Sequence, residues 1–214
     1  IYENISYFAI ESSSDMAVEK ESYESYTGSL WDQGTFPIDT WKQVMKLRGN
    51  SDEVNLRKNW DKLKKKVAKQ GMRNSNTMAI APTATISYIA GCSQSIEPNF
   101  GVIFVYSTLS GEFTMMNEYF VNDMKSEGIW TKELANLVKT VDGDLGKLNG
   151  SIPQWIKEKY VTAFQQDQFK LIDCAAARQK WIDQGQSLNL YNDKSSMKFL
   201  NDIYTHAWKS GLKT

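Results

Sequence analysis

Two short apolar segments, residues 77–81 and 102–106, most constrain what this chain can fold into. Each has the length of a buried strand, and uniform apolar character is expected where both faces of a strand are covered. Neither is long enough to cross a membrane. A third segment, Ser187–Tyr191, alternates polar and apolar residues with the period of two that is typical of a strand. Because helical patterns separate the three, their order favours α/β layers or an α/β barrel, with too few strands to close a barrel.

Helical periodicity accounts for most of the remaining sequence. We expect helices over residues 1–26, 52–70, 117–127, 131–140, 171–182 and 195–210, a short one at 88–90, and one that begins at Pro153. The glycines expected to end helices are Gly71, Gly91, Gly185 and Gly211. In the first helix the expected apolar face consists of Ile5, Phe8, Ala9, Met16 and Val18. Residues 27–52 are expected to form an irregular connection pinned by aromatic side chains, and 142–150 a loop.

The charges of the chain balance, with 25 Lys and Arg residues against 25 Asp and Glu residues. A neutral chain is a poor general binder of nucleic acid or of anionic membranes. The lysine-rich stretch Lys58–Lys69, densest at Lys62–Lys66, is therefore interpreted as the solvated face of an amphipathic helix. A scaffold that contacts nucleic acid through this stretch is the weaker alternative.

Residue types that hold metals or act as nucleophiles are scarce. The two cysteines, Cys92 and Cys174, form no C-x-x-C motif, and His206 is the single histidine. We expect reduced, partly buried thiols, a packing or surface histidine, and no metal site. Three acids at helical spacing, Glu11, Asp15 and Glu19, could suggest a carboxylate face that binds a metal. Without a histidine partner, they are interpreted as a solvated helix face. The sequence shows neither a secretory signal nor a membrane span, so we expect a cytoplasmic protein.

The strongest chemical signal directly follows the first apolar segment. Thr83, Thr85 and Ser87 place three hydroxyl groups at the start of a predicted helix. The first amides of a helix have no internal partner and carry the positive end of its dipole, so such a turn can bind an anion. The same hydroxyl groups could instead cap the helix, which needs no ligand. On spacing alone, capping is favoured over anion binding. The glycines and lysine of a P-loop are missing, which disfavours a nucleoside triphosphatase.

The segment Ala81–Ser87, followed by Gly91-Cys92-Ser93-Gln94-Ser95-Ile96-Glu97-Pro98, closely resembles the substrate-phosphate loop of the ribonucleotide reductase large (α) subunit. Further blocks resemble this family in the same order: Arg73-Asn74-Ser75, Ser110-Gly111-Glu112-Phe113, Gly128-Ile129-Trp130, Arg178–Gln184, Gln186–Asn189 and Trp208–Thr214. The resemblance covers essentially the whole chain, and the form of the loop is similar to the aerobic, two-subunit class I enzymes.

The resemblance implies a fold and a site. Residues 1–214 would be one helix-rich segment of the family's ten-stranded α/β barrel, incomplete by itself. The family reduces ribonucleoside diphosphates to deoxyribonucleotides, the precursors of DNA. The substrate diphosphate would be held by backbone amides and by the hydroxyl groups of Thr83, Thr85 and Ser87. Ala84 and Ile86 would contribute amides only, and Ala81 and Pro82 would lie near the sugar and base. Glu97 and Pro98 would be structural residues of the turn after the loop.

The resemblance also implies what this chain does not contribute. The family's catalytic cysteines, with their neighbouring Asn and Glu, would precede Ile1, and its radical-relay tyrosine pair would follow Thr214. We therefore expect no catalytic residue and no cofactor in this chain, which would be inactive alone. The enzyme would need the remaining large-subunit segments, which include the ATP-binding allosteric region. It would also need a small (β) subunit with a metal and radical cofactor, and thioredoxin or glutaredoxin. The alternative is a stand-alone nucleotide- or phosphate-binding module without catalysis.

Overall fold

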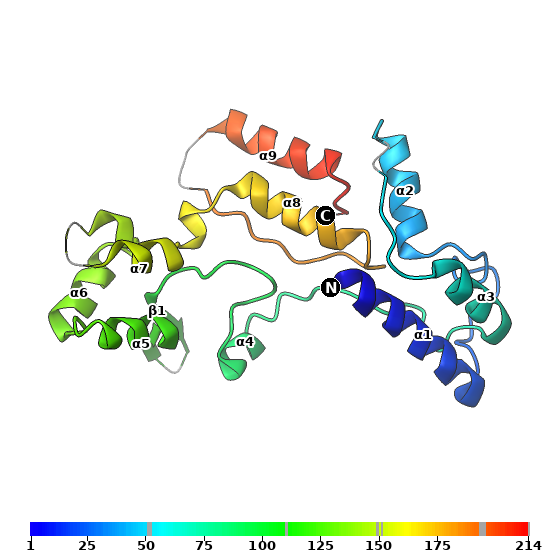
Figure 1. Cartoon of the computed structure of the whole chain (residues 1–214), viewed down its shortest axis with the longest axis horizontal. Coiled ribbons are helices and arrows are strands. Elements are labelled where there is room, and N and C mark those ends of the chain that lie inside the picture. The colour runs from blue at the N-terminus through cyan, green and yellow to red at the C-terminus, as the bar shows by residue number, and fades with distance from the viewer. Residues whose placement is uncertain (51–52, 110, 149, 151, 193–195, 214) are drawn as a thin grey trace.

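The computed structural model describes residues 1–50, 53–109, 111–148, 150, 152–192 and 196–213. The elements lie in three groups along the long axis (Figure 1). One end holds α1 (Tyr2–Lys20), α2 (Pro37–Leu47) and α3 (Trp60–Gln70). The middle holds α4 (Ile86–Ala90), α8 (Gln168–Gln179) and α9 (Met197–Lys209). The other end holds β1 (Ile103–Thr108), β2 (Gly111–Met116), α5 (Glu118–Ser126), α6 (Lys132–Thr140) and α7 (Gln154–Lys159), with 3-10 turns at Leu145–Lys147 and Ala163–Gln165.

Helix α1 packs on α3 through a face that differs from the predicted one. Its buried residues are Glu3, Ser6, Tyr7, Ile10, Ser13, Ser14 and Ala17, and those left exposed include Ile5, Phe8, Met16 and Val18. Serine is tolerated on the buried face because its hydroxyl group finds an acceptor, as where Ser14 Oγ donates to Gln70 Oε1 at 3.1 Å. The predicted apolar face of the first helix is therefore wrong, and the helix ends at Lys20 rather than at residue 26.

Residues 27–52 are not irregular throughout, because they contain α2. Pro37 stands at the start of this helix, and the Asp39 carboxylate accepts the Phe36 N–H at 2.9 Å. Ile38 and Met45 are buried on the face that joins the core of this end. The expectation that aromatic side chains pin this stretch is confirmed, because Trp31, Phe36 and Trp41 are all buried in that core.

The lysine-rich helix is shorter than predicted. Helix α3 begins at Trp60 rather than at residue 52, because the Asn59 side chain accepts the Lys62 N–H at 3.0 Å and caps it there. Residues 51 and 52 lie outside the described ranges. The helix ends at Gly71, as predicted. The φ of Gly71 is 80°, and a Cβ at this position would lie 2.0 Å from Ser22 Oγ, so both backbone and space favour glycine.

The opposite end of the molecule is built on a hairpin. β1 and β2 pair antiparallel from Ile103↔Met116 to Thr108↔Gly111, and within the described residues they form the sheet of the molecule. The predicted strand at 102–106 is thus confirmed, but the expectation that both its faces are covered is wrong, since Val105 is exposed. Helices α5 and α6 match their predicted ranges, and α7 follows Pro153 as expected. Their core includes Phe120, Val138 and Ile156.

In the middle group, α8 packs on α9 through a core that includes Ile172, Ala175 and Ile203 (Figure 1). Helix α8 ends at Gln179, so the prediction that it runs to 182 and ends at Gly185 is wrong. Helix α9 is within two residues of its predicted range, and Gly211 follows it with φ of 90°. In the described part of the chain, no helix is long and apolar enough to span a membrane.

The predicted strands at 77–81 and 187–191 do not form as strands. The two segments nevertheless run side by side, because Ile80 and Gln186 form a single parallel bridge. The Ser187 N–H donates to the Ile80 carbonyl at 2.8 Å, and the Gln184 N–H to the Met78 carbonyl at 3.2 Å. A single bridge is too little to count as a strand, so the segments stay extended coil. A closed barrel is accordingly not formed by the described residues, which are rich in helix.

Candidate functional site

The segment 81–87 forms an exposed turn that leads into α4. The Ser87 N–H donates to the Thr83 carbonyl at 3.0 Å, and the Tyr88 N–H to the Thr85 carbonyl at 3.2 Å. Thr83 has φ of 51°, a left-handed conformation that is rare for a β-branched residue. Helix α4 ends at Gly91, as predicted, with φ of 67°. The turn is therefore tight, local and strained at one threonine.

Most residues of this turn are exposed. Ala81, Pro82, Ala84, Thr85 and Ile86 are exposed. Among the described residues no acceptor pairs with the backbone N–H of 84, 85 or 86. Thr85 holds the N-cap position of α4, yet its side chain caps no amide. The capping explanation for the hydroxyl groups therefore fails at this residue.

The other two hydroxyl groups of the turn are oriented differently. Thr83 is half-buried, and its Oγ1 accepts the Ser95 N–H at 2.8 Å. Ser87 is buried, with its Oγ at 3.5 Å from the Ala84 carbonyl oxygen. A distance of 3.5 Å marks a weak hydrogen bond. The structure thus leaves the amides of 84–86 without an acceptor and Thr85 exposed, holds the Thr83 hydroxyl group against Ser95, and buries Ser87.

A buried carboxylate stands behind the turn. Glu97 Oε1 accepts the backbone N–H of Asn189 at 2.9 Å, and both its oxygens accept the Asn189 side-chain amide at 3.1 and 3.0 Å. The Tyr191 hydroxyl group lies 3.4 Å from Glu97 Oε2. Burial, followed by the nearby Glu97 charge, raises the pKa of Tyr191. Sequence reasoning placed Glu97 in the turn after the loop but could not supply its partners, which lie more than ninety residues away.

The entry to the turn is held by a second carboxylate. Asp183 Oδ2 accepts the Thr77 N–H at 2.6 Å, and Asp183 Oδ1 accepts the Met78 N–H at 3.0 Å. Behind it, Gln186 is buried and donates through Nε2 to the Ala175 carbonyl of α8 at 2.8 Å. The extended segment before the turn is thereby tied to the turn after α8.

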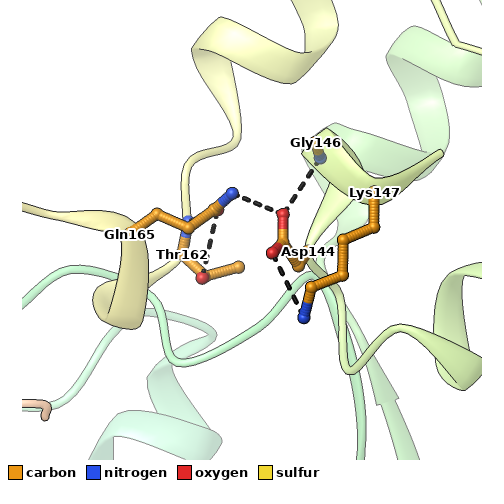
Figure 2. A network of polar contacts seen from close by, with 5 residues as sticks. All are labelled: Asp144, Gly146, Lys147, Thr162 and Gln165. Atoms are coloured by element: carbon orange, nitrogen blue, oxygen red, sulfur yellow. Dashed lines mark hydrogen bonds and ion pairs between the residues drawn. The ribbon is translucent and has the colours of Figure 1, made fainter. Parts of the chain in front are cut away.

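Two polar clusters at the hairpin end have no counterpart in the sequence predictions. In one, Asp144 Oδ1 accepts from Gly146 N at 3.0 Å and from Gln165 Nε2 at 2.5 Å, and Lys147 Nζ lies 3.4 Å from Asp144 Oδ2 (Figure 2). Gln165 also accepts from Thr162, so the cluster joins the two 3-10 turns (Figure 2). The polar side chains of the cluster pair with one another, which indicates a structural role.

The second cluster is centred on Asp123 of α5. Asp123 Oδ2 accepts from Lys159 Nζ at 2.6 Å and from the Tyr160 hydroxyl group at 2.6 Å. These two donors, Lys159 first, lower the pKa of Asp123. The cluster ties α5 to the end of α7. No signal in the sequence could have found it, because the charges are isolated in the sequence and meet only in space.

A shallow cleft of about 410 Å³ lies between α2, α8 and α9. Trp41, Lys180 and His206 are among the residues that line it. His206 Nε2 lies 2.7 Å from Asp173 Oδ1, so the histidine is a paired surface residue, in line with the sequence interpretation. The Trp41 indole N–H has no partner among the described residues, and a Cβ at Gly211 would lie 2.9 Å from it, so it faces backbone rather than the open cleft.

The remaining candidate residues do not converge on a site. Cys92 and Cys174 are free and exposed, so the expectation of partly buried thiols is wrong. In the described ranges no group of three His, Cys, Asp or Glu residues could hold a metal ion. Lys66 Nζ lies 2.8 Å from Asp15 Oδ1 and 3.5 Å from Glu11 Oε1. The lysine-rich face of α3 is therefore partly neutralised by α1, which fits a solvated helix face better than a nucleic-acid interface.

Comparison with known proteins gives a consistent picture. A family model described as the ribonucleotide reductase barrel domain matches residues 1–214. The ribonucleoside-diphosphate reductase subunit alpha of Chlamydia muridarum (strain MoPn / Nigg) is 45% identical over 215 residues, which are 99% of this chain and 20% of that protein. The large subunit of Trypanosoma brucei brucei is 36% identical over 218 residues, which are 100% of this chain and 26% of that protein.

A solved structure resembles the chain as well. The Actinobacillus ureae class Id ribonucleotide reductase alpha subunit superposes with a TM-score of 0.58 and 23% identity, over 86% of this chain and 35% of that one. At this identity the likeness concerns the fold alone. The chain spans about a fifth to a quarter of the length of the curated relatives named above. With a family model that matches its whole length, the chain belongs to the ribonucleotide reductase large-subunit barrel-domain family.

Proposed function

We propose that this chain is a segment of a ribonucleoside-diphosphate reductase large subunit and that it binds the diphosphate of the substrate through Ala81–Ser87. One observation carries the proposal: three consecutive amides, at 84, 85 and 86, are without an acceptor among the described residues in an exposed turn. Backbone N–H groups that converge at such a turn suit phosphate oxygens. Family membership supplies the chemical identity of the ligand as a ribonucleoside diphosphate.

The residues of the turn have separate roles in this proposal. The amides of Ala84, Thr85 and Ile86 donate to phosphate oxygens, and the Thr85 hydroxyl group adds an exposed donor. Thr83 Oγ1 already accepts the Ser95 N–H, so its own proton is left to donate to the ligand. Ala81 and Pro82 stand on the approach to the turn, on the side proposed for sugar and base. Ser87 is buried, so its amide and hydroxyl group hold the turn itself.

The chemistry of the reaction is proposed to come from outside this chain. Neither Cys92 nor Cys174 is assigned a redox role, and the chain is proposed to be inactive by itself. The working enzyme would include other large-subunit segments with the ATP-responsive allosteric region, and a small subunit that supplies a metal-based radical. Thioredoxin or glutaredoxin would be the reductant. The product would be a deoxyribonucleotide for DNA synthesis, made in the cytoplasm.

The proposal is tested by assembling the chain with the complementary large-subunit segments and the small subunit and by measuring reduction of CDP. The double variant Thr83→Val/Thr85→Val keeps the shape of the side chains, removes two hydroxyl donors and also removes the acceptor of the Ser95 N–H. We expect its KM for CDP to rise about tenfold or more with kcat nearly unchanged, because hydrogen bonds to charged groups are lost in ground and transition state alike. Thr140→Val, on the exposed side of α6, is the matched control. An unchanged KM, or an inactive but correctly assembled mixture, would overturn the proposal.

The alternative of a stand-alone binding module draws support from one feature. The contacts that hold the turn, from Ser95, Asn189 and Asp183, all come from this chain. Calorimetry of the isolated chain with CDP separates the two functions. Clear binding by the isolated chain, together with no activity after assembly, would favour the module.

A further inference from the structure

The chain that follows the phosphate turn is fixed to a distant segment by the side chain of Glu97. Glu97 is 8% exposed, and its carboxylate accepts from the backbone and side chain of Asn189 and from the Tyr191 hydroxyl group. A carboxylate has acceptor positions only, so it can serve all three donors at once. Hydrogen bonds to an ionised acceptor are about twice as strong as neutral ones. Glu97 therefore fixes the chain at 97 to the segment 187–191.

This attachment reaches the ligand-facing residues through Ser95. Two positions before Glu97, the Ser95 N–H donates to Thr83 Oγ1 at 2.8 Å, and Ser95 Oγ donates to the Ser187 carbonyl at 3.1 Å. Thr83 and Ser95 both have positive φ, 51° and 49°. Such conformations cost energy and persist only where surrounding contacts hold them. The position of Ser95 thus sets the orientation of the Thr83 hydroxyl group.

The far side of the attachment is itself held by contacts to α8 and to Phe164. The Tyr191 N–H donates to Gln168 Oε1 at 2.7 Å, and Gln168, in the first turn of α8, is buried. The Tyr191 ring packs edge-on against Phe164 with centroids 5.3 Å apart. The segment that receives Glu97 is therefore anchored on α8 and is able to act as a fixed reference for the turn.

We propose that Glu97 is a positioning residue for substrate binding: through Asn189, Tyr191 and Ser95 it holds Thr83 and the amides of 84–86 in the geometry that receives the diphosphate. This inference rests on the proposed function of the turn. Glu97 does not touch the ligand, and its effect is carried by the backbone between 83 and 97. A residue with this role affects the affinity for the diphosphate and leaves the rest of the chain folded.

The test exchanges the acceptor role of Glu97 and the donor role of Asn189 in the assembled large subunit and measures the Kd for CDP. In Glu97→Gln, a side-chain NH2 group faces the N–H donors of Asn189. In Asn189→Asp, a second carboxylate faces the carboxylate of Glu97. We expect each variant to bind CDP about tenfold more weakly, the usual value of a buried hydrogen bond to a charged group.

In the double variant Glu97→Gln/Asn189→Asp, the new amide at position 97 donates to the new carboxylate at position 189. We expect its Kd to return to within about threefold of the parent. Glu127→Gln, exposed after α5, is the control.

Each outcome bears on a different claim. If the parent binds CDP and Glu97→Gln binds it equally well, Glu97 is not a positioning residue, while the proposed function stands. If the parent binds no CDP, or Thr83→Val/Thr85→Val binds it unchanged, the proposed function itself fails. Tyr191→Phe removes only the 3.4 Å contact and is the gentler variant, with an expected loss of about twofold in affinity. Weak binding that the exchanged pair does not restore would show a merely structural role and would also overturn the inference.

Discussion

At the scale of single residues, the sharpest consequence concerns Asp183. Its carboxylate accepts the backbone N–H groups of Thr77 and Met78 and the Thr77 hydroxyl group. Asp183→Asn keeps the size of the side chain but replaces one accepting oxygen by an NH2 group, which cannot accept from these donors. We expect the free energy of unfolding in urea to fall by about 2 kcal/mol, as when a charged acceptor is lost. Hydrogen exchange of the Thr77 and Met78 amides should accelerate in parallel. Asp202→Asn, exposed on α9, is the control, and an unchanged exchange rate at both amides would contradict the assignment.

The hydroxyl residues of the turn at 81–87 could be named as candidates from the sequence, but their hydrogen-bond partners could not. The run Thr83, Thr85 and Ser87 is local, so its place before a short helix follows from the sequence alone. The inward orientation of Ser87 and the acceptor role of Thr83 depend on Ser95 and on the left-handed φ, which residue type does not reveal. The donors to Glu97 come from the far side of the chain, where only folding brings them close.

At the scale of elements, a pH-dependent contact joins α5 to α7. Hydrogen bonds from Lys159 and then Tyr160 hold the pKa of Asp123 below its ordinary value of 3.8. Asp123 gives up its proton more readily in the folded state than in the unfolded state. The contact therefore stabilises the protein at pH values above 3.8, and this stabilisation is lost as the pH falls through the lowered pKa of Asp123. We expect Asp123→Asn to lower the Tm at pH 7 and to converge with the parent in strong acid. Thermal unfolding by circular dichroism across this pH range measures it, with Glu24→Gln as the control. A difference in Tm that is independent of pH would contradict it.

Elements were predictable where local signals decide them and not where tertiary contacts do. Helices α5, α6 and α9 match their predicted ranges because each carries a capping residue and a clear apolar stripe: Asn117, Thr131 and Ser196 accept from the first turn. Helix α1 has a mixed pattern, so its buried face was set by α3 and not by hydropathy. The segments at 77–81 and 187–191 have strand character but meet at one bridge only.

At the scale of the whole molecule, the chain is more open than a compact monomer. It exposes 13394 Å², whereas a compact protein of 24.4 kDa exposes roughly 10,000 Å² by the usual scaling of area with mass. Its apolar interior is divided into three cores, represented by Ile10, Phe120 and Ile172. A divided interior and excess surface are expected of a segment that packs with further parts of its family's barrel.

The openness predicts how the isolated chain behaves in solution. Ile5, Phe8 and Met16 lie on the outer side of α1, 48, 52 and 40% exposed, and neighbouring apolar side chains on one helix face favour association. We expect the isolated chain to self-associate as its concentration rises in sedimentation velocity. Changing all three to Gln should weaken association at least about tenfold, since each buried side chain of this size contributes on the order of 1–2 kcal/mol. Leu47→Gln removes one exposed leucine outside this face and should change little. A parent chain that stays monomeric at every concentration, or equal association of both variants, would show that this face of α1 does not drive contact between molecules.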